Sequence, residues 1–208
     1  MEELSQTVLV VSIVLILLTA LAVGIRFWSR FDTVRILGLD DGLVFFSWIA
    51  SIVVCSSIAA ATRYGLGVHH NKVPIPEYET FLKIQIATSV SYSLGVTSAK
   101  ASFAILYLRL FPVRSLMILN KAVVIFLLCQ AIEESLVVPF RCSPIKKSWI
   151  PDLEGYCFDL HPLWYTTFAF NLTTDIILFI EPMLIVWRLQ MPLVKRIALV
   201  VMLSLGVL

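Results

Sequence analysis

The stretch GVTSAKASFAILYLRLFP, residues 95–112, is almost wholly apolar and holds one lysine, Lys100, near its middle. This run is too apolar for a helix on the surface of a soluble protein, yet it carries a full positive charge. Of the 208 residues in the chain, 59% are hydrophobic and 14% are charged, whereas a soluble domain has about 25% charged residues. A soluble core of this size could not bury so much apolar surface, so the sequence predicts an integral membrane protein.

Five apolar segments are long enough to cross a bilayer, which takes about 20 residues; they are residues 7–27, 43–62, 84–110, 122–140 and 163–187. A sixth segment starts near residue 193 and is too short to span before the chain ends. The start of the chain, MEELSQ, is acidic, which argues against a cleaved signal peptide. We therefore expect an all-α polytopic transmembrane helix bundle that forms a single domain over residues 1–208 and is incomplete at its C-terminal end.

Lysines and arginines in the short loops indicate how the bundle is oriented. Nine of the 16 lie on one side of the predicted spans and six on the other, which places the N-terminus outside or in a lumen. The outer loop between the fourth and fifth segments then contains Cys142 and Cys157. An oxidising compartment allows these two cysteines to form a disulfide. We expect a multi-pass protein of the plasma membrane or an endomembrane.

Lys100 needs a partner, because a lysine at mid-membrane costs about 3 kcal/mol. Snorkelling to the inner side is unfavourable, since Arg109, near that boundary, is about 13 Å further along the helix and helical side chains lean toward the N-terminus. The fifth segment offers Asp175 and Glu181, which point about 120° apart, and Asn171 one turn from Asp175. We predict an intramembrane polar cluster of Lys100, Asp175, Asn171 and Glu181, in which Lys100 pairs with Asp175. The cluster either fixes helix packing or lines a functional pocket.

Two acids in the fourth segment, Glu133 and Glu134, raise the same question. Glu134 lies seven residues before Arg141 on one helical face, so the two can form a shallow ion pair near the outer surface. Alternatively, Glu133 or Glu134 donates a proton in a functional pocket. The sequence leaves both possibilities open.

Charged residues also mark the predicted cytoplasmic face. Asp40 and Asp41 open the second segment, where acids cap a helix and complement its dipole; paired acids also bind Mg²⁺–diphosphate, but no further carboxylates follow at helical spacing. Arg109 closes the third segment as a positive-inside anchor. We expect no metal site, because the histidines His69, His70 and His161 lack ligand spacing. We also expect no nucleic-acid partner, since no basic run is interleaved with aromatics.

Six motifs occur in an order that resembles the fungal rhodopsin-domain integral membrane proteins. They are RFWSR (26–30), Asp40-Asp41, GLGVH (65–69), KASFAILYLRLF (100–111), CSPIKKSW (142–149) with Cys157, and NLTTD (171–175) followed by VWRLQMP (186–192). Members of that family are receptor-like seven-helix proteins; some are grouped with pathogenicity-type receptors and others belong to toxin gene clusters of the satratoxin type. The resemblance implies seven helices with the N-terminus outside, of which this chain holds the first five to six.

The same resemblance marks Lys100, Arg109, Asp175 and both loop cysteines as positions of the family pattern. It does not imply retinal, which needs a lysine in a last helix that this chain does not reach, so we expect no cofactor. Glu181, before Pro182, departs from the apolar residue expected there.

Two classes of function are consistent with these features. The first is a receptor-like protein that senses a small hydrophobic ligand from outside and couples to a cytoplasmic signalling partner. The second is a membrane-embedded, cyclase-like enzyme of secondary metabolism, or an accessory protein of such a cluster, with one intramembrane acid as proton donor. No nucleophile triad or phosphate loop is present in the sequence, so whether the protein is an enzyme stays open. Both classes have the lipid bilayer as a partner.

Overall fold

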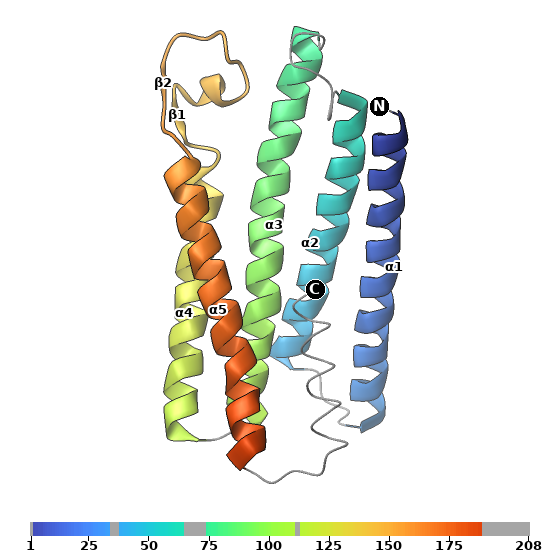
Figure 1. Ribbon diagram of the computed structural model, residues 1–208, viewed down its shortest axis with the longest axis vertical. Helices are drawn as coiled ribbons and strands as arrows, with labels where there is room; N and C mark the ends of the chain where they lie inside the picture. Colours follow the sequence, from blue (N-terminus) through green and yellow to red (C-terminus); the bar gives the residue numbers. More distant parts are fainter. Residues whose placement is uncertain (1, 34–37, 65–73, 111–112, 189–208) are drawn as a thin grey trace.

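A computed structural model describes residues 2–33, 38–64, 74–110 and 113–188 of the chain. They form five α-helices, α1 (Glu2–Thr33), α2 (Leu39–Ala61), α3 (Ile75–Leu110), α4 (Arg114–Val137) and α5 (His161–Arg188). The helices lie side by side, with α1 at one edge, α2 and α3 next to it, and α4 and α5 on the far side (Figure 1). The predicted all-α polytopic bundle is therefore confirmed, and the short sixth segment from residue 193 lies outside the described residues.

The helices extend beyond the apolar segments from which they were predicted. The helix expected from residue 84 begins at Ile75, and the one expected from residue 122 begins at Arg114. The added turns, IPEYETFLK (75–83) and RSLMILNK (114–121), mix charged residues with apolar ones, which weakens the membrane signal there, yet most of their residues are tolerated well in a helix. Helix α4 ends at Val137 rather than at residue 140, because Pro139 has no backbone N–H to continue the hydrogen-bond ladder.

Four helices are long and apolar enough to cross a membrane by composition, over Thr7–Ser29, Leu39–Ala61, Arg114–Val137 and His161–Met183. Helix α3 is not among them, although it is the longest at 36 residues. Its buried polar residues are Ser93, Thr97, Ser98, Lys100 and Ser102. Helix α3 runs between α2 and α4 (Figure 1), so these groups face other helices rather than lipid. This central position, and not composition, supports the prediction that residues 84–110 cross the membrane.

Small residues and a compact apolar core hold α3 to its neighbours. A Cβ atom on Gly95 would lie 3.1 Å from the Cβ of Ala50, so α2 and α3 approach closely at this point, as membrane helices do where small residues meet. On its other side α3 shares a buried apolar core with α4 and α5, made of Ala101, Ala104, Tyr107, Val123, Leu127 and Leu178. Helix α3 is thus the common element of both interfaces.

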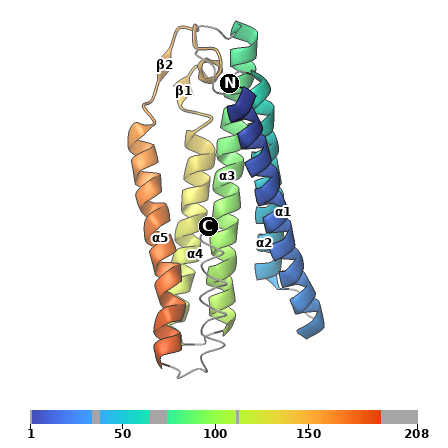
Figure 2. The same cartoon turned by 45° about the vertical axis from the view of Figure 1, so that its right-hand side comes forward.

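A disulfide-linked hairpin connects α4 to α5. Strands β1 (Cys142–Ser143) and β2 (Tyr156–Cys157) pair antiparallel, and a disulfide joins Cys142 to Cys157, which confirms the predicted bond. The hairpin is docked on the helices, because the buried Ser148 hydroxyl donates to the Pro139 carbonyl and Lys83 of α3 lies over the Trp149 ring. The N-terminal end of α1 lies at this same end of the bundle (Figure 2), which we call the hairpin end.

Candidate functional site

The centre of the bundle contains a polar cluster that joins α3 to α5. The Lys100 ammonium lies 2.9 Å from Asp175 Oδ1. It also donates to the Asn171 carbonyl at 2.9 Å, to Asn171 Oδ1 at 3.0 Å and to Thr174 Oγ1 at 3.1 Å. One carboxylate therefore balances the charge, and neutral oxygens occupy the remaining donor directions. The sequence missed Thr174, which follows Asn171 by three residues and so shares its helical face.

The two charged partners of this cluster are unequally enclosed. The Lys100 side chain is 10% exposed, whereas the Asp175 side chain is 38% exposed. The positive charge is thus enclosed between helices, while its counter-charge stays open on one side. The arrangement offers a single carboxylate that another group can reach without first separating α3 from α5.

Glu181 was expected in the Lys100 cluster, and the structure places it elsewhere. Both of its carboxylate oxygens accept hydrogen bonds at 3.0 Å from the Asn120 side-chain amide of α4. Glu181 and Asn120 are both buried. The separation of about 120° from Asp175 directs Glu181 toward α4 instead of α3. Asn120 could not be recognised as a partner, because the predicted fourth segment began two residues after it.

The acids near the hairpin end of α4 differ from each other. Glu133 is exposed, whereas Glu134 is partly buried and accepts a hydrogen bond at 3.0 Å from the Gln130 side chain. No ion pair joins Glu134 to Arg141, although both lie in the described part of the chain. Of the two possibilities, the shallow pair is therefore not formed in the structure, where Glu134 Oε1 accepts from Gln130 instead.

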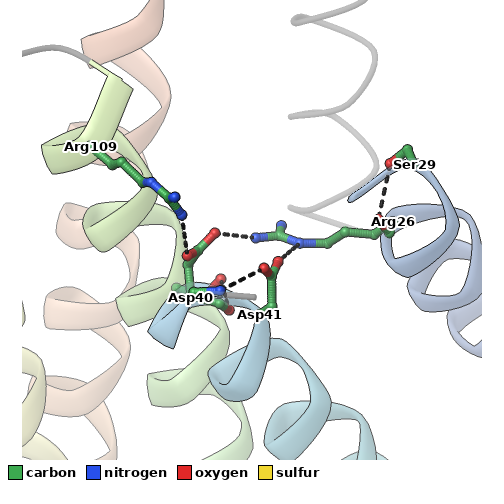
Figure 3. Close-up of polar contacts among 7 residues, drawn as sticks. Arg26, Ser29, Asp40, Asp41 and Arg109 are labelled. Carbon is green, nitrogen blue, oxygen red and sulfur yellow. Dashed lines mark hydrogen bonds and ion pairs between the residues drawn. The ribbon is translucent and has the colours of Figure 1, made fainter. Parts of the chain in front are cut away.

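A second charged cluster ties α1, α2 and α3 together at the end opposite the hairpin (Figure 3). Arg26 of α1 lies 3.3 Å from Asp40 Oδ2 and 3.3 Å from Asp41 Oδ1. Arg109 of α3 lies 3.8 Å from Asp40 Oδ1, and the Ser102 hydroxyl donates to the Asp40 carbonyl at 3.0 Å. Both aspartates are almost fully buried, at 1% and 2% exposure. Asp40 and Asp41 are thus the junction of three helices, a role that the sequence reading missed.

The local structure of α2 explains how the two aspartates reach this position. The N-cap is Gly38, not an aspartate. Asp41 Oδ2 accepts a hydrogen bond from the Gly38 backbone N–H at 3.2 Å, which satisfies a group that a helix start leaves without a partner. Asp40 and Asp41 therefore lie in the first turn, where the helix dipole also stabilises them. The capping expectation was right about the helix end and wrong about the N-cap residue.

Gly38 provides a test of how tightly this cluster is packed. In Gly38→Ala, the new Cβ would collide with Asp40 Oδ1 and lie 2.9 Å from Arg109 Nη1. We expect the substitution to lower the free energy of unfolding by about 1–3 kcal/mol, as overpacking does elsewhere. The measurement is thermal unfolding of the full-length protein in detergent.

The matched control for this substitution is Gly42→Ala in the same helix. A Cβ at Gly42 meets nothing within 4 Å, and alanine is the better helix former by about 1 kcal/mol. The two substitutions should therefore have opposite signs. Equal effects would contradict a tightly packed cluster at the start of α2.

Of the three histidines, the structure describes only His161. The ring of His161 lies 5.5 Å from that of Trp164 in an edge-to-face contact, and His69 and His70 lie outside the described residues. Within the described ranges, no group of three or more metal-ligating side chains occurs.

The fold and the two clusters define a multi-pass membrane protein whose third helix carries charges that bind the second and the fifth. A family model described as the fungal rhodopsin domain matches residues 25–208. The chain belongs to this fungal rhodopsin domain family, as the motifs had suggested.

Three curated proteins are similar to the chain. A polyenoic acids biosynthesis gene cluster protein of Metarhizium anisopliae is 30% identical over 189 residues, which cover 88% of this chain and 52% of that protein. A SAT4 family membrane protein of Emericella nidulans is 26% identical over 71% of this chain and 39% of its own length. A fugralins biosynthesis cluster protein of Gibberella zeae is 33% identical over 33% of this chain and 17% of its own length.

The chain thus spans about half the length of the first of these relatives and less of the others. No solved structure gives a significant match to the chain.

Proposed function

We propose that this chain is the membrane domain of a receptor-like protein that senses a small hydrophobic ligand from outside. The observation that carries the proposal is the double role of α3. Its Lys100 pairs with Asp175 of α5 in the middle of the bundle, and its Arg109 contacts Asp40 of α2 at the end opposite the hairpin. These two α3 residues are nine apart, about 13 Å along the helix axis.

A helix with this arrangement can pass a change from the middle of the membrane to one face. An incoming ligand would contact the partly exposed carboxylate of Asp175 and so weaken or strengthen its ion pair with Lys100. A ligand that binds better when α3 and α5 are separated would shift the population toward that state by its difference in affinity. Any movement of α3 then acts on Asp40, and through it on Arg26 of α1. A cytoplasmic signalling partner would bind at that end of the bundle and respond to this movement.

Two features support an orientation with the hairpin end outside. The disulfide between Cys142 and Cys157 needs an oxidising compartment. The excess of lysines and arginines lies on the opposite side, as cytoplasmic loops require. In this orientation the N-terminus is outside or lumenal, and the cluster of Arg26, Asp40, Asp41 and Arg109 faces the cytoplasm.

A second candidate function is a membrane-embedded enzyme or accessory protein of secondary metabolism. It is favoured by the names of two relatives, which refer to polyenoic acid and fugralin biosynthesis clusters. Its proton donor would be Asp175, Glu181, Glu133 or Glu134. Glu181 suits this role best, because it is the only one of these four acids that is buried, at 3% exposure.

Deleting the gene and complementing it with variants distinguishes the two functions. A receptor predicts that deletion changes the expression of target genes without changing the structure of any product, and that Arg109→Gln and Asp175→Asn both fail to restore expression. An enzyme predicts that an unprocessed precursor accumulates, and that Glu181→Gln or another single acid variant reproduces this while Arg109→Gln does not. Accumulation of a precursor would therefore overturn the receptor proposal.

A further inference from the structure

The Asp175 carboxylate has one oxygen that the bundle does not use. Its Oδ1 atom lies 2.9 Å from the Lys100 ammonium. Within the described part of the chain, no hydrogen bond reaches its other oxygen, Oδ2. The Asp175 side chain is also 38% exposed, although the cluster lies at the centre of the bundle. Asp175 therefore presents one accepting oxygen to a molecule that contacts this side of α5.

The Lys100 ammonium, by contrast, has no donor to spare. A lysine ammonium has three N–H groups. Four oxygens lie around them at 2.9–3.1 Å, which are those of the Asp175 carboxylate, the Asn171 carbonyl, the Asn171 side chain and the Thr174 hydroxyl. An anion could bind Lys100 only by displacing one of these oxygens. The free hydrogen-bonding capacity of the cluster is therefore that of an acceptor.

The helical period of α5 places this carboxylate at the edge of an apolar surface. Asn171 and Thr174, which bind Lys100, lie about 40° and 100° from Asp175 on one side of the helix. Leu172 and Ile176 lie about 60° and 100° from Asp175 on the other side, and they are 50% and 48% exposed. An apolar molecule that packs on these two side chains would thus have its polar end beside the Asp175 carboxylate.

We propose, resting on the function proposed above, that the ligand is a neutral alcohol, an apolar molecule whose hydroxyl group donates a hydrogen bond to the Asp175 carboxylate. A neutral donor fits the charges, because Lys100 and Asp175 already balance each other. An ammonium ligand would add an uncompensated charge within the membrane, which is costly. A carboxylate ligand offers no donor, and the negative charge of Asp175 would repel it.

The test measures equilibrium binding of radiolabelled hexadecanol to the full-length protein in lipid nanodiscs, with binding to empty nanodiscs subtracted. Three competitors share its alkyl chain: hexadecyl methyl ether lacks the donor, palmitate is an anion and hexadecylamine is a cation. A hydrogen bond to a charged group changes an affinity by about tenfold or more. We therefore expect each of the three to bind at least about tenfold more weakly than unlabelled hexadecanol.

The double variant Lys100→Met with Asp175→Leu removes the acceptor without leaving an unpaired charge. It should lose the preference for hexadecanol over the ether. The matched control is Thr173→Val, which removes an exposed hydroxyl that donates to the Ala169 carbonyl and lies about 160° around α5 from Asp175. This control should keep the preference. The thermal unfolding midpoint shows whether each variant is folded.

Bilayers themselves supply one class of alcohol, the sterols, so cholesterol is added as a further competitor. Displacement of hexadecanol by cholesterol would show that a membrane sterol can occupy the site. A lack of displacement would indicate an alcohol that arrives from outside the membrane. The hydroxyl is the recognised group in both cases.

A neutral alcohol is ruled out as the ligand if hexadecanol shows no saturable binding or if the ether competes as well as the alcohol does. Tighter binding of palmitate or hexadecylamine would rule it out too, as would a double variant that keeps the preference. These results leave the receptor proposal standing, because that proposal is decided by gene expression and product structure after gene deletion.

Discussion

The Asp175→Asn variant is expected to lose about 3 kcal/mol of folding free energy, the lower end of the cost of breaking a buried ion pair. The substitution leaves the Lys100 ammonium enclosed between α3 and α5 with only the neutral oxygens of Asn171 and Thr174 around it. The measurement is the thermal unfolding midpoint of the full-length protein in detergent.

The reverse substitution tests the same pair from the other side. Lys100→Met leaves the Asp175 carboxylate without its counter-charge inside the membrane, so we expect a loss of about 3 kcal/mol here as well. The double variant Lys100→Met with Asp175→Leu should be close to the unchanged protein in stability, since well-packed apolar residues often replace a buried pair at no cost. The control is Glu133→Gln, which alters an exposed acid on α4. Unchanged stability in both single variants would contradict the ion pair.

Removing the disulfide is the second change with a large expected effect. Cys142 and Cys157 are 15 residues apart, and closing a loop of this length stabilises by about 3 kcal/mol in the chain-entropy model. The loss should be confined to the hairpin, because the helix interfaces of α3 do not depend on it. In Cys142→Ser, we therefore expect residues 143–156 to exchange amide hydrogens and to be cleaved by protease much faster, while the helices stay protected.

Three comparisons make this test specific. Cys157→Ser and the double variant should behave like Cys142→Ser, since all three lack the same bond. A reducing agent should give the unchanged protein the same exchange rates. Cys129→Ser, at an exposed free cysteine of α4, should change nothing, and loss of helix protection in any hairpin variant would show that the bond stabilises more than its own loop.

Depth along the helices was readable from the sequence, and this is why Lys100 and Asp175 were predicted together. Each lies a countable number of residues from an arginine at the same boundary, and a rise of 1.5 Å per residue converts those counts into heights. The face of each side chain follows from the helical period in the same way. That period put Glu181 about 120° from Asp175, and in the structure Glu181 of α5 accepts its hydrogen bonds from Asn120 of α4.

The contacts that the sequence analysis missed involve polar residues near the ends of the helices. Arg26, Asp40 and Arg109 each have an adequate local explanation, as boundary anchors or as part of a helix start, so nothing in the local sequence required a contact among three helices. Asn120 lay just outside the predicted apolar segment. Apolar periodicity identifies what faces lipid, but it says nothing about polar residues in the turns beyond the membrane core, which is where these contacts form.

The polarity of α3 has a consequence for how the protein is made. Asp175 is synthesised 75 residues after Lys100. At about 5–20 residues per second, Lys100 therefore has no counter-charge for about 4–15 s. During that interval α3 is a poor candidate for independent entry into lipid, because a central lysine opposes insertion. Its insertion should therefore depend on α2, already synthesised and closely packed against it. Truncated nascent chains that end before α5 should retain α3 beside the translocon, and release should follow once residue 175 has emerged.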